Sequence, residues 1–461
     1  MSAPVVVILA AGKGTRMRSS VPKLLHPICG RPMIGWPVAV ARASGAAKIV
    51  VVDAPERPLK QHLDDDIVSV VQAQPLGTGD AVKAALNEIQ PEQTVVVLTG
   101  DTPLIRAESI AELVKTHDES GAAATILTAI LDEPGAYGRV VRDQSGHVTK
   151  VVEAKAAGDA TPEELRIQEV NSGIFAFSGA RLKDALARVQ NDNAQGEYYL
   201  PDVLPILKSD GHKVAAHALQ DPVEMAGINH RVQLAEVTRH AQQRINHQHM
   251  LNGVTLINPD ATVIDADVEL GHDVTIEQGC TLRGATTVAA GASIGPHATL
   301  IDAEVGEGST VIHSYVNLAV IDKNVSVGPF VYLRPKAHLH DGSKAGTFVE
   351  IKNSEVGPGA KVPHLSYIGD TDIGARTNIG AGTITANYDG VNKHRTTIGA
   401  DVKSSVHVSF VAPVSVGDNG WTAAGSVITD DVPAGALGVA RARQSNIEGY
   451  AERRKAPKEQ A

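Results

Sequence analysis

The spacing of hydrophobic residues changes near residue 228, which divides the chain into two differently patterned parts. Before that point, short apolar runs alternate with segments of helical periodicity. Strands that alternate with helices predict a mostly parallel sheet covered on both faces, so residues 1–228 are expected to form a Rossmann-like α/β domain. The predicted strands include Val5–Leu9, Lys48–Val52, Val95–Leu98 and Ala124–Ile130, and the predicted helices include Ala81–Ile89 and Ala107–Lys115.

Residues 229–250 follow a second pattern, since this segment contains no Gly or Pro and has apolar residues such as Val232, Leu234 and Val237 at helical intervals. It is predicted to be one exposed linker helix. The segment also carries histidines, which we interpret as solvated helix residues rather than as a metal site. They are His230, His240, His247 and His249.

From about residue 251, apolar residues recur at a strict interval of six. This period does not fit a helix with about 3.6 residues per turn, but it is typical of a parallel β-helix with one short strand per repeat. Residues 251–461 are therefore predicted to form a left-handed parallel β-helix of hexapeptide repeats. The first apolar row is Ile264, Leu270, Ile276, Leu282, Val288, Ile294 and Leu300, and the row two positions earlier is Thr262, Val268, Val274, Cys280, Thr286, Ala292 and Ala298.

The repeat is interrupted twice and resumes each time. Glycines are expected at its corners, where the backbone turns tightly and positive φ is needed. The polar segment 383–394, TITANYDGVNKH, breaks the rhythm and is predicted to project as a functional loop. The resumed rows are Val356, Val362 and Ile368, then Val402, Val408 and Val414, and the corner glycines include Gly291, Gly295, Gly357 and Gly417.

The composition agrees with these two architectures, because 43% of residues are hydrophobic but only 3% are aromatic, and small side chains suit narrow coils. The net charge of −10 argues against non-specific binding of nucleic acid, which needs a basic surface. Cys29 and Cys280 are too few for a disulfide framework. The apolar run Val5–Ala11 has no basic residue before it, and no other run is long enough to cross a membrane. We therefore predict a cytoplasmic protein without membrane insertion.

Candidate chemistry begins in the segment LAAGKGTRM (residues 9–17), where glycines follow a predicted strand. Gly12 and Gly14 allow backbone amides to approach a phosphate, and Lys13 and Arg16 can neutralise a triphosphate. Lys23 follows in VPKLLH and can reach the same phosphate. Taken alone, each motif also fits a tight turn with solvated charges.

Together the two motifs resemble the sugar-phosphate nucleotidyltransferases, and the resemblance continues through QAQPLGTGDA, LTGDTPL, YGRV, VVEAK, EVNSGIF, NAQGEYYLPD and GINHR. It is strongest to the bifunctional GlmU family, in which a uridylyltransferase is fused to an acetyltransferase. The resemblance implies that Arg16 and Lys23 contact phosphates. It further implies a binding site for UTP and the N-acetylated sugar, in which Gly138, Glu153 and Asn171 hold the sugar. The whole site is formed by Leu9, Ala10, Ala11, Gly12, Lys23, Gln72, Gly77, Thr78, Gly138, Glu153, Asn171 and Asn229.

The same resemblance implies that Asp101 and Asn229 hold Mg²⁺. This assignment fits the ion, because Mg²⁺ characteristically takes one or two protein oxygens and completes its shell with phosphate and water. Phosphoryl transfer is mainly positioning and neutralisation of charge, so cations and one metal are sufficient. Without the family, a helix N-cap before Pro103 is the less favoured alternative interpretation of Asp101.

The second half carries FVYLRPKAHL, GTFVEIKN, KVPHLSYIGD, NIGAGTITANYDG and VAR (residues 439–441), which resemble the acetyltransferase half of the same family. The resemblance implies that His364 accepts the proton lost by an attacking amine, a role suited to histidine. The glucosamine 1-phosphate contacts it implies are Arg334, Lys352, Tyr367 and Asn378. The acetyl-CoA contacts it implies are Ala381, Asn387, Tyr388, Ser405, Ala424 and Arg441, with Arg443, Arg453, Arg454 and Lys455 as a basic tail near the CoA phosphates.

One stretch departs from the family pattern. Ser405 stands where glycine is expected and Val406 where the ligand-binding serine is expected, and Trp421 lies in a coil that is normally narrow. These differences predict shifted register or weakened acetyl transfer in the coils near residues 403–424.

The sequence thus predicts bifunctional synthesis of UDP-N-acetylglucosamine: acetyl-CoA acetylates glucosamine 1-phosphate, and the product then receives a uridylyl group from UTP with release of pyrophosphate. This product feeds cell-envelope precursor synthesis. The resemblance also implies a homotrimer with active sites between β-helices. One alternative is a nucleotidyltransferase for another sugar phosphate, with a non-catalytic oligomerising β-helix. Two further alternatives are a zinc lyase that uses His338, His340 or His364, and a non-catalytic trimeric scaffold.

Overall fold

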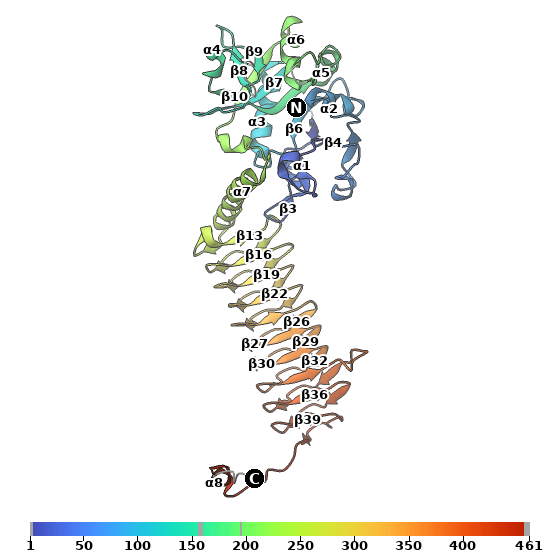
Figure 1. The fold of residues 1–461 in the computed structure, drawn as a ribbon, viewed down its shortest axis with the longest axis vertical. Helices are drawn as coiled ribbons and strands as arrows, with labels where there is room; N and C mark the ends of the chain where they lie inside the picture. The colour runs from blue at the N-terminus through green and yellow to red at the C-terminus, as the bar shows by residue number, and fades with distance from the viewer. Residues whose placement is uncertain (1–2, 155–159, 194–195, 456–461) are drawn as a thin grey trace, which may run out of the picture. The chain divides into compact units, whose positions relative to one another are not determined.

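The computed structural model describes residues 3–154, 160–193 and 196–455. The end of the VVEAK motif and two residues of NAQGEYYLPD lie outside these described residues. The chain forms two compact units, Met1–Arg244 and Ile245–Ala461 (Figure 1). The helix expected over residues 229–250 is α7, Arg231–Leu251, and the division between the units falls within it.

The first unit is built on a nine-stranded sheet whose main path has the order β11-β7-β10-β6-β1-β4-β5. Strand β10 runs antiparallel to its neighbours β6 and β7, whereas the pairs β1–β4, β1–β6, β4–β5 and β7–β11 are parallel. The strands are β1 (Val5–Leu9), β4 (Lys48–Asp53), β5 (Val68–Val71), β6 (Thr94–Thr99), β7 (Ala124–Ile130), β8 (Arg139–Arg142), β9 (Val148–Val152), β10 (Glu169–Ser178) and β11 (Val214–Ala218), with the small hairpin β2 (Pro27–Ile28) and β3 (Arg31–Pro32) beside them.

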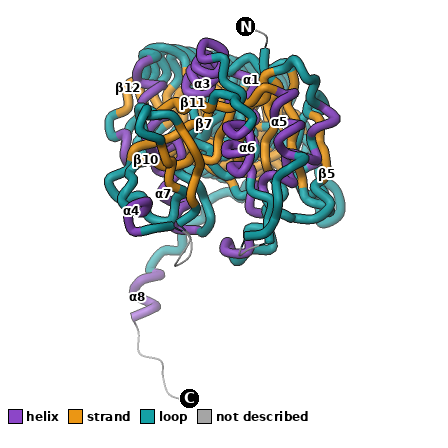
Figure 2. The backbone as a smooth tube through the Cα atoms, turned by 90° about the horizontal axis from the view of Figure 1, so that it is seen from above, coloured by secondary structure: helices purple, strands orange, loops and turns teal. Residues whose placement is uncertain are grey.

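Helices cover this sheet, and Figure 2 shows α3, α5 and α6 lying around its strands. The strands are rich in Val and Ile because both of their faces are buried, as in other covered parallel sheets. The predicted mostly parallel α/β domain is therefore confirmed. The helices are α1 (Gly35–Ala43), α2 (Thr78–Ala84), α3 (Ala107–Ser120), α4 (Pro162–Leu165), α5 (Gly179–Leu186) and α6 (Val203–Ser209).

The second unit is a parallel β-helix made of short strands stacked into three long sheets. The first sheet contains β12 (Thr255–Leu256), β15 (Thr275–Ile276), β18 (Ser293–Ile294), β21 (Thr310–Val311), β24 (Ser326–Val327), β27 (Lys344–Thr347) and β30 (Lys361–His364), and its face continues as β35 (Lys403–Ser404), β38 (Trp421–Thr422) and β40 (Leu437–Gly438). The second sheet contains β13 (Val263–Ile264), β16 (Thr281–Arg283), β19 (Thr299–Ile301), β22 (Tyr315–Asn317), β25 (Tyr332–Leu333), β28 (Glu350–Lys352), β31 (Tyr367–Gly369), β33 (Ile384–Ala386), β36 (Ser409–Val411) and β39 (Val427–Ile428).

The third sheet of the β-helix completes each coil. It contains β14 (Glu269–Leu270), β17 (Thr287–Val288), β20 (Glu304–Val305), β23 (Val320–Ile321), β26 (Ala337–Leu339), β29 (Ser354–Val356), β32 (Thr371–Ile373), β34 (Thr396–Ile398) and β37 (Val414–Val416). A last helix, α8 (Tyr450–Lys455), follows the coils.

The two rows of residues spaced by six point into the coils, as the periodicity predicts. Every member of both rows is buried except Leu270, which is partly buried against the same core. The rows that resume at Val356 and Val402 are buried as well. Each coil contacts only the coils beside it. Small and branched side chains fill the interior because the coil is narrow.

Two kinds of glycine occupy the corners. Gly291 and Gly295 have φ of 69° and 107°, the left-handed region that favours glycine. Gly357 and Gly417 lack positive φ and are needed for another reason. A Cβ at Gly357 would lie 2.7 Å from the carbonyl oxygen of Ile373 in the next coil.

The structure corrects two details of the predicted coils. The projecting loop begins at Asn387 rather than at Thr383, because Ile384–Ala386 forms β33 in register with β31 and β36. Trp421 does not enter the narrow coil, since its side chain is 53% exposed while the next residue, Thr422, faces inward. The pairing of β35 with β38 continues without a shift, so the register change predicted for this region is absent there.

Candidate functional site

The first unit contains a cleft of about 570 Å³ at the carboxyl ends of its parallel strands. Leu9 ends β1 and residues 10–12 follow it, Gln72 follows β5, and Asp101 follows β6. Because these strands are parallel and adjacent through β4, their carboxyl ends meet at one edge of the sheet, which is where α/β sheets bind ligands. The cleft is lined by Leu9, Ala10, Ala11, Gly12, Lys13, Thr15, Lys23, Leu24, Gln72, Pro75, Gly77, Thr78, Ala81, Thr99, Asp101 and Glu197.

The predicted phosphate-binding cations contact the predicted metal ligands. Lys23 Nζ lies 2.5 Å from Asp101 Oδ2, and Arg16 Nη2 donates to Asn229 Oδ1 at 2.7 Å. The backbone N–H of Ile228 also donates to the carbonyl of Asp101, which holds the segment with Asn229 beside β6. Two oxygen ligands and two cations are thus gathered in one place.

The wall of the cleft near α2 is organised by a buried amide. The side-chain nitrogen of Gln72, which is 4% exposed, donates to the carbonyl of Gly77 at 3.1 Å and to Asp80 Oδ2 at 2.8 Å. Gly77 has a φ of 108°, and Thr78 Oγ1 accepts from the backbone of Leu200 at 3.0 Å. These contacts fix the backbone that precedes α2, whose N-terminus suits an anionic ligand.

The three residues predicted to hold the sugar lie together on neighbouring strands. Gly138 precedes β8, Glu153 follows β9, and Asn171 belongs to β10. The backbone N–H of Asn171 donates to the carbonyl of Gly138 at 2.9 Å. A Cβ at Gly138 would lie 2.9 Å from Val151, so a side chain there would disturb this group. Tyr137, which we did not predict as a site residue, lies near Asp101, and partial burial raises the pKa of its phenol.

In the second unit, the predicted sugar-phosphate contacts follow one sheet of the β-helix. Arg334 follows β25, and Lys352 ends β28. Tyr367 begins β31, and its hydroxyl lies against Gly369. A Cβ at Gly369 would lie 2.5 Å from the Tyr367 hydroxyl, so a side chain there would displace the ring. Arg334 Nη1 donates to Glu350 Oε1 at 2.8 Å, a pair that raises the pKa of the guanidinium.

Asp370 organises this region, although the sequence motifs did not single it out. Its carboxylate is 6% exposed and accepts from Lys352 Nζ at 3.2 Å, from Asn353 at 2.5 Å and from the amide of Asn387. Burial opposes ionisation of Asp370, but the hydrogen bonds from Asn353, Asn387 and Lys352 hold its pKa below the ordinary value. Buried polar groups bonded in this way are positioned firmly. The signal in the sequence that could have identified Asp370 was its position at the end of the quoted motif KVPHLSYIGD.

His364 lies at a corner of the β-helix, next to the sheet that carries Lys352. Its imidazole is exposed and makes no hydrogen bond to any residue that the structure describes. Backbone hydrogen bonds link this corner through four successive coils. Gly382 N–H donates to the carbonyl of His364 at 3.3 Å, His407 N–H to that of Ala381 at 2.7 Å, and Gly425 N–H to that of Val406 at 2.9 Å. They align His364 with Ala381, Val406 and Ala424, while Ser405 precedes Val406 in the same turn.

The remaining predicted acetyltransferase residues are more dispersed within this unit. Asn378 pairs with Lys361 of β30, the strand of the first sheet that ends at His364. Lys352 belongs to the second sheet, on a different face. Tyr388 is 60% exposed in the projecting loop, and its hydroxyl donates to the carbonyl of Gly390. Arg441 is exposed beyond the last strand.

Of the three histidine candidates for a zinc lyase, His338 and His340 lie side by side at the end of β26, with ring centroids 3.9 Å apart, and His364 lies apart from them. His338 and His340 belong to the third sheet, whereas His364 ends a strand of the first sheet. No helix in the described part of the chain combines the length and hydrophobicity that a membrane-spanning segment needs.

A cleft of this kind joined to a hexapeptide β-helix defines a nucleotidyltransferase fused to a second catalytic or oligomerising unit. The family model of the MobA-like NTP transferase domain matches residues 6–195. Curated relatives extend the similarity across both units. The bifunctional protein GlmU of Caldanaerobacter subterraneus subsp. tengcongensis is 45% identical over 98% of each chain.

Two further relatives agree. The bifunctional protein GlmU of Streptomyces avermitilis is 47% identical over 98% of this chain and 94% of its own, and that of Kineococcus radiotolerans is 48% identical over 96% and 91%. The chain therefore belongs to the bifunctional GlmU family. The family resemblance is confirmed, and with it a transferase with two activities whose family uses a divalent metal.

Proposed function

We propose that this chain acetylates glucosamine 1-phosphate at its β-helix and then converts the product into UDP-N-acetylglucosamine in its N-terminal cleft. The observation that carries the proposal is the coverage of the relatives, which extends through both units rather than through the nucleotidyltransferase alone. A nucleotidyltransferase for another sugar, with a non-catalytic β-helix, is not favoured for the same reason.

In the cleft, the phosphate of the sugar attacks the α-phosphorus of UTP and expels pyrophosphate. Arg16 and Lys23 neutralise the triphosphate, and Gln72, Gly77 and Thr78 hold the nucleotide. The attacking phosphate is already anionic, so no side-chain base is needed. Catalysis then consists of positioning and stabilisation of charge, as in other phosphoryl transfers.

Mg²⁺ is the divalent ion that fits this site best. The oxygens of Asp101 and Asn229 are hard ligands, and two protein oxygens leave room for phosphate and water. When bound, Mg²⁺ would neutralise charge on the triphosphate. Lys23 and Arg16 contact these same oxygens, so each cation would exchange its present partner for a substrate phosphate.

At the β-helix, His364 accepts a proton from the amine of glucosamine 1-phosphate as that amine attacks the thioester of acetyl-CoA. CoA leaves as the thiol. Arg334 and Lys352 bind the sugar phosphate, Tyr367 and Asn378 hold the sugar, and Asn387 contacts acetyl-CoA or the sugar. Ala381, Tyr388, Ser405, Ala424 and Arg441 contact acetyl-CoA.

A homotrimer would complete this second site. The corner that includes His364 continues as an exposed apolar row, in which Phe330, Phe348 and Leu365 are 55%, 57% and 59% exposed. The rings of Phe330 and Phe348 stack with centroids 5.4 Å apart. Exposed apolar patches of this kind mark interaction surfaces. Packing of a second copy there would place its residues beside His364. We also propose that the trimer works in the cytoplasm.

An assay of the purified chain tests both reactions. Glucosamine 1-phosphate, acetyl-CoA, UTP and Mg²⁺ are supplied, and free thiol and pyrophosphate are followed separately. Thiol release followed by pyrophosphate supports the proposal. If pyrophosphate forms only from N-acetylglucosamine 1-phosphate supplied directly, the acetyl-transfer half of the proposal is wrong.

A further inference from the structure

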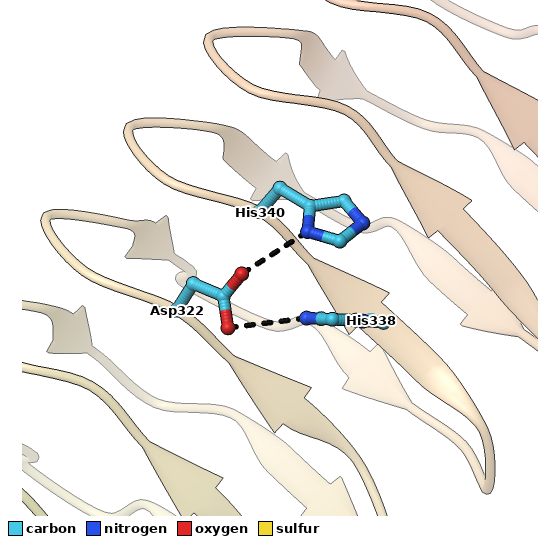
Figure 3. Close-up of side chains that lie close together, drawn as sticks. All are labelled: Asp322, His338 and His340. Atoms are coloured by element: carbon cyan, nitrogen blue, oxygen red, sulfur yellow. Dashed lines mark hydrogen bonds and ion pairs between the residues drawn. The ribbon is translucent and has the colours of Figure 1, made fainter.

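The third sheet of the β-helix carries a group of metal-ligating side chains away from the predicted substrate contacts. His338 and His340 flank Leu339, which is fully buried, so both imidazoles point outward on the same face of β26. Asp322 follows β23 in the coil before, and Glu355 of β29 is the register partner of His338 in the coil after. Figure 3 shows the carboxylate of Asp322 directed at both rings.

The two carboxylates lie on opposite sides of the imidazole pair. Asp322 Oδ1 is 3.1 Å from His338 Nε2, and Asp322 Oδ2 is 3.1 Å from His340 Nδ1. The other ring nitrogens face Glu355 Oε2, at 3.2 Å from His338 Nδ1 and 2.9 Å from His340 Nε2. All four ring nitrogens therefore face a carboxylate oxygen.

A neutral imidazole carries only one N–H and cannot donate from both nitrogens. With both rings neutral, one nitrogen of each ring points a lone pair at a carboxylate, and the four groups together carry two negative charges. A divalent cation would accept the imidazole lone pairs that otherwise face a carboxylate, and it would balance the two negative charges.

We propose that Asp322, His338 and His340 bind a divalent transition-metal ion of the zinc class. One donor atom from each of these residues lies within 4.8 Å of the others. Ligands about 2.0–2.1 Å from a tetrahedral ion are about 3.3 Å apart, close to the 3.1 Å that separates Asp322 from each of the two imidazoles. Two imidazoles and one carboxylate are ligands that zinc and its neighbours prefer over Mg²⁺ or Ca²⁺.

Glu355 completes the arrangement as a supporting residue. With the ion bound to His338 Nε2 and His340 Nδ1, the outer nitrogens of both rings donate to Glu355. Metal-bound histidines characteristically donate their second N–H to a carboxylate in this way, which fixes the tautomer. Since Asp322, the histidines and Glu355 belong to three successive coils, the ion would cross-link the stack.

Metal titration of the purified, untagged full-length chain tests the proposal. Zn²⁺ is titrated against a chromogenic chelator without Mg²⁺, and the double variant His338→Gln/His340→Gln is compared with the native chain. We expect the variant to lose one equivalent of bound zinc, with a fall in affinity of at least about 100-fold, and to retain both transferase activities. The matched control is His272→Gln, whose imidazole faces only Asp273, at 2.9 Å, and it should keep native affinity.

Two further measurements keep the test decisive if the double variant folds poorly. Co²⁺ bound to the native chain should give the visible ligand-field absorption of a four-coordinate site with nitrogen ligands. Glu355→Gln should weaken binding by about 10- to 100-fold without removing a ligand. Equal zinc stoichiometry and affinity in the native chain and the folded double variant would overturn the proposal, as would the absence of four-coordinate cobalt absorption from the native chain.

Discussion

The cleft of the first unit and the corner of the β-helix place their functional residues in opposite ways. In the cleft, strands β1, β5 and β6 deliver their ends to one edge, and the predicted site residues Gly12, Lys23, Gln72 and Asp101 line one pocket. At the β-helix, Lys352, His364 and Asn378 are distributed over two faces and the corner between them. A sheet edge collects residues from distant sequence, whereas a solenoid spreads them along its length.

A substitution at one site should leave the reaction at the other site unchanged. The largest loss of activity is expected for a substitution at the corner of the β-helix that includes His364. His364→Ala removes the proposed proton acceptor and should lower the rate of acetyl transfer by roughly 10²–10⁴. Thiol release from acetyl-CoA measures this rate. Uridylyl transfer from N-acetylglucosamine 1-phosphate should remain at the native rate, and a parallel fall in both reactions would contradict the separation.

The reciprocal change is made in the cleft. Asp101→Asn keeps the size of the side chain but removes its charge, which weakens the divalent site and frees Lys23 from its ion pair. Uridylyl transfer should fall by roughly 10²–10³, the usual loss when one group that stabilises transition-state charge is removed. Pyrophosphate release measures it, and unchanged thiol release in the same preparation serves as the control.

The regular coils that carry the second site can be tested by their stability. Leu300 is fully buried in the row of residues spaced by six, so Leu300→Ala should lower the free energy of unfolding by about 2–5 kcal/mol. Trp421→Ala removes a larger but exposed side chain and should change it by no more than about 0.5 kcal/mol. Chemical denaturation of both variants compares them, and a larger loss for Trp421→Ala would contradict the placement of its ring outside the coil.

Asp370 gives a smaller effect with a defined pH dependence. Asp370→Asn removes charge-assisted hydrogen bonds to Lys352 and Asn387, each worth about 1.5–3 kcal/mol, so KM for the sugar phosphate should rise about tenfold while kcat changes little. The lowered pKa of Asp370 means that its stabilising contribution is present above the ordinary value of about 3.9 and is lost as pH falls through the folded value.

Acid unfolding checks the sign of that contribution. The native chain should lose more stability than Asp370→Asn as pH falls below about 4, because only the native chain has this carboxylate to protonate. Equal acid sensitivity of the two chains would show that the carboxylate does not anchor Lys352 and Asn387.

Periodicity predicted the architecture well, because a narrow coil admits only certain side chains at fixed positions. Both rows of residues spaced by six face inward, apart from the partial exposure of Leu270. The exact start of the projecting loop was not predictable from polarity alone, since Thr383 and Thr385 are buried with their hydroxyls bonded to backbone carbonyls. Trp421 was misinterpreted because composition does not tell which face of a strand a residue occupies.

The candidate sites were predictable to a different extent. The motifs identified Lys23, Asp101, Arg16 and Asn229 one by one, but not that they form two pairs, since pairing depends on three-dimensional contacts between residues 78 and 213 positions apart. Asp370 was missed for the same reason. Its role comes from hydrogen bonds with Lys352 and Asn387, which only the stacked coils bring within reach.

A complementation assay tests the central claim of two separate sites in one chain most directly. His364→Ala and Asp101→Asn are mixed in equal amounts with glucosamine 1-phosphate, acetyl-CoA, UTP and Mg²⁺, and UDP-N-acetylglucosamine is measured. Each variant alone should form almost none, whereas the mixture should form it at a substantial fraction of the native rate, because the acetylated sugar made by one variant is used by the other. A mixture no more active than either variant alone would contradict the claim.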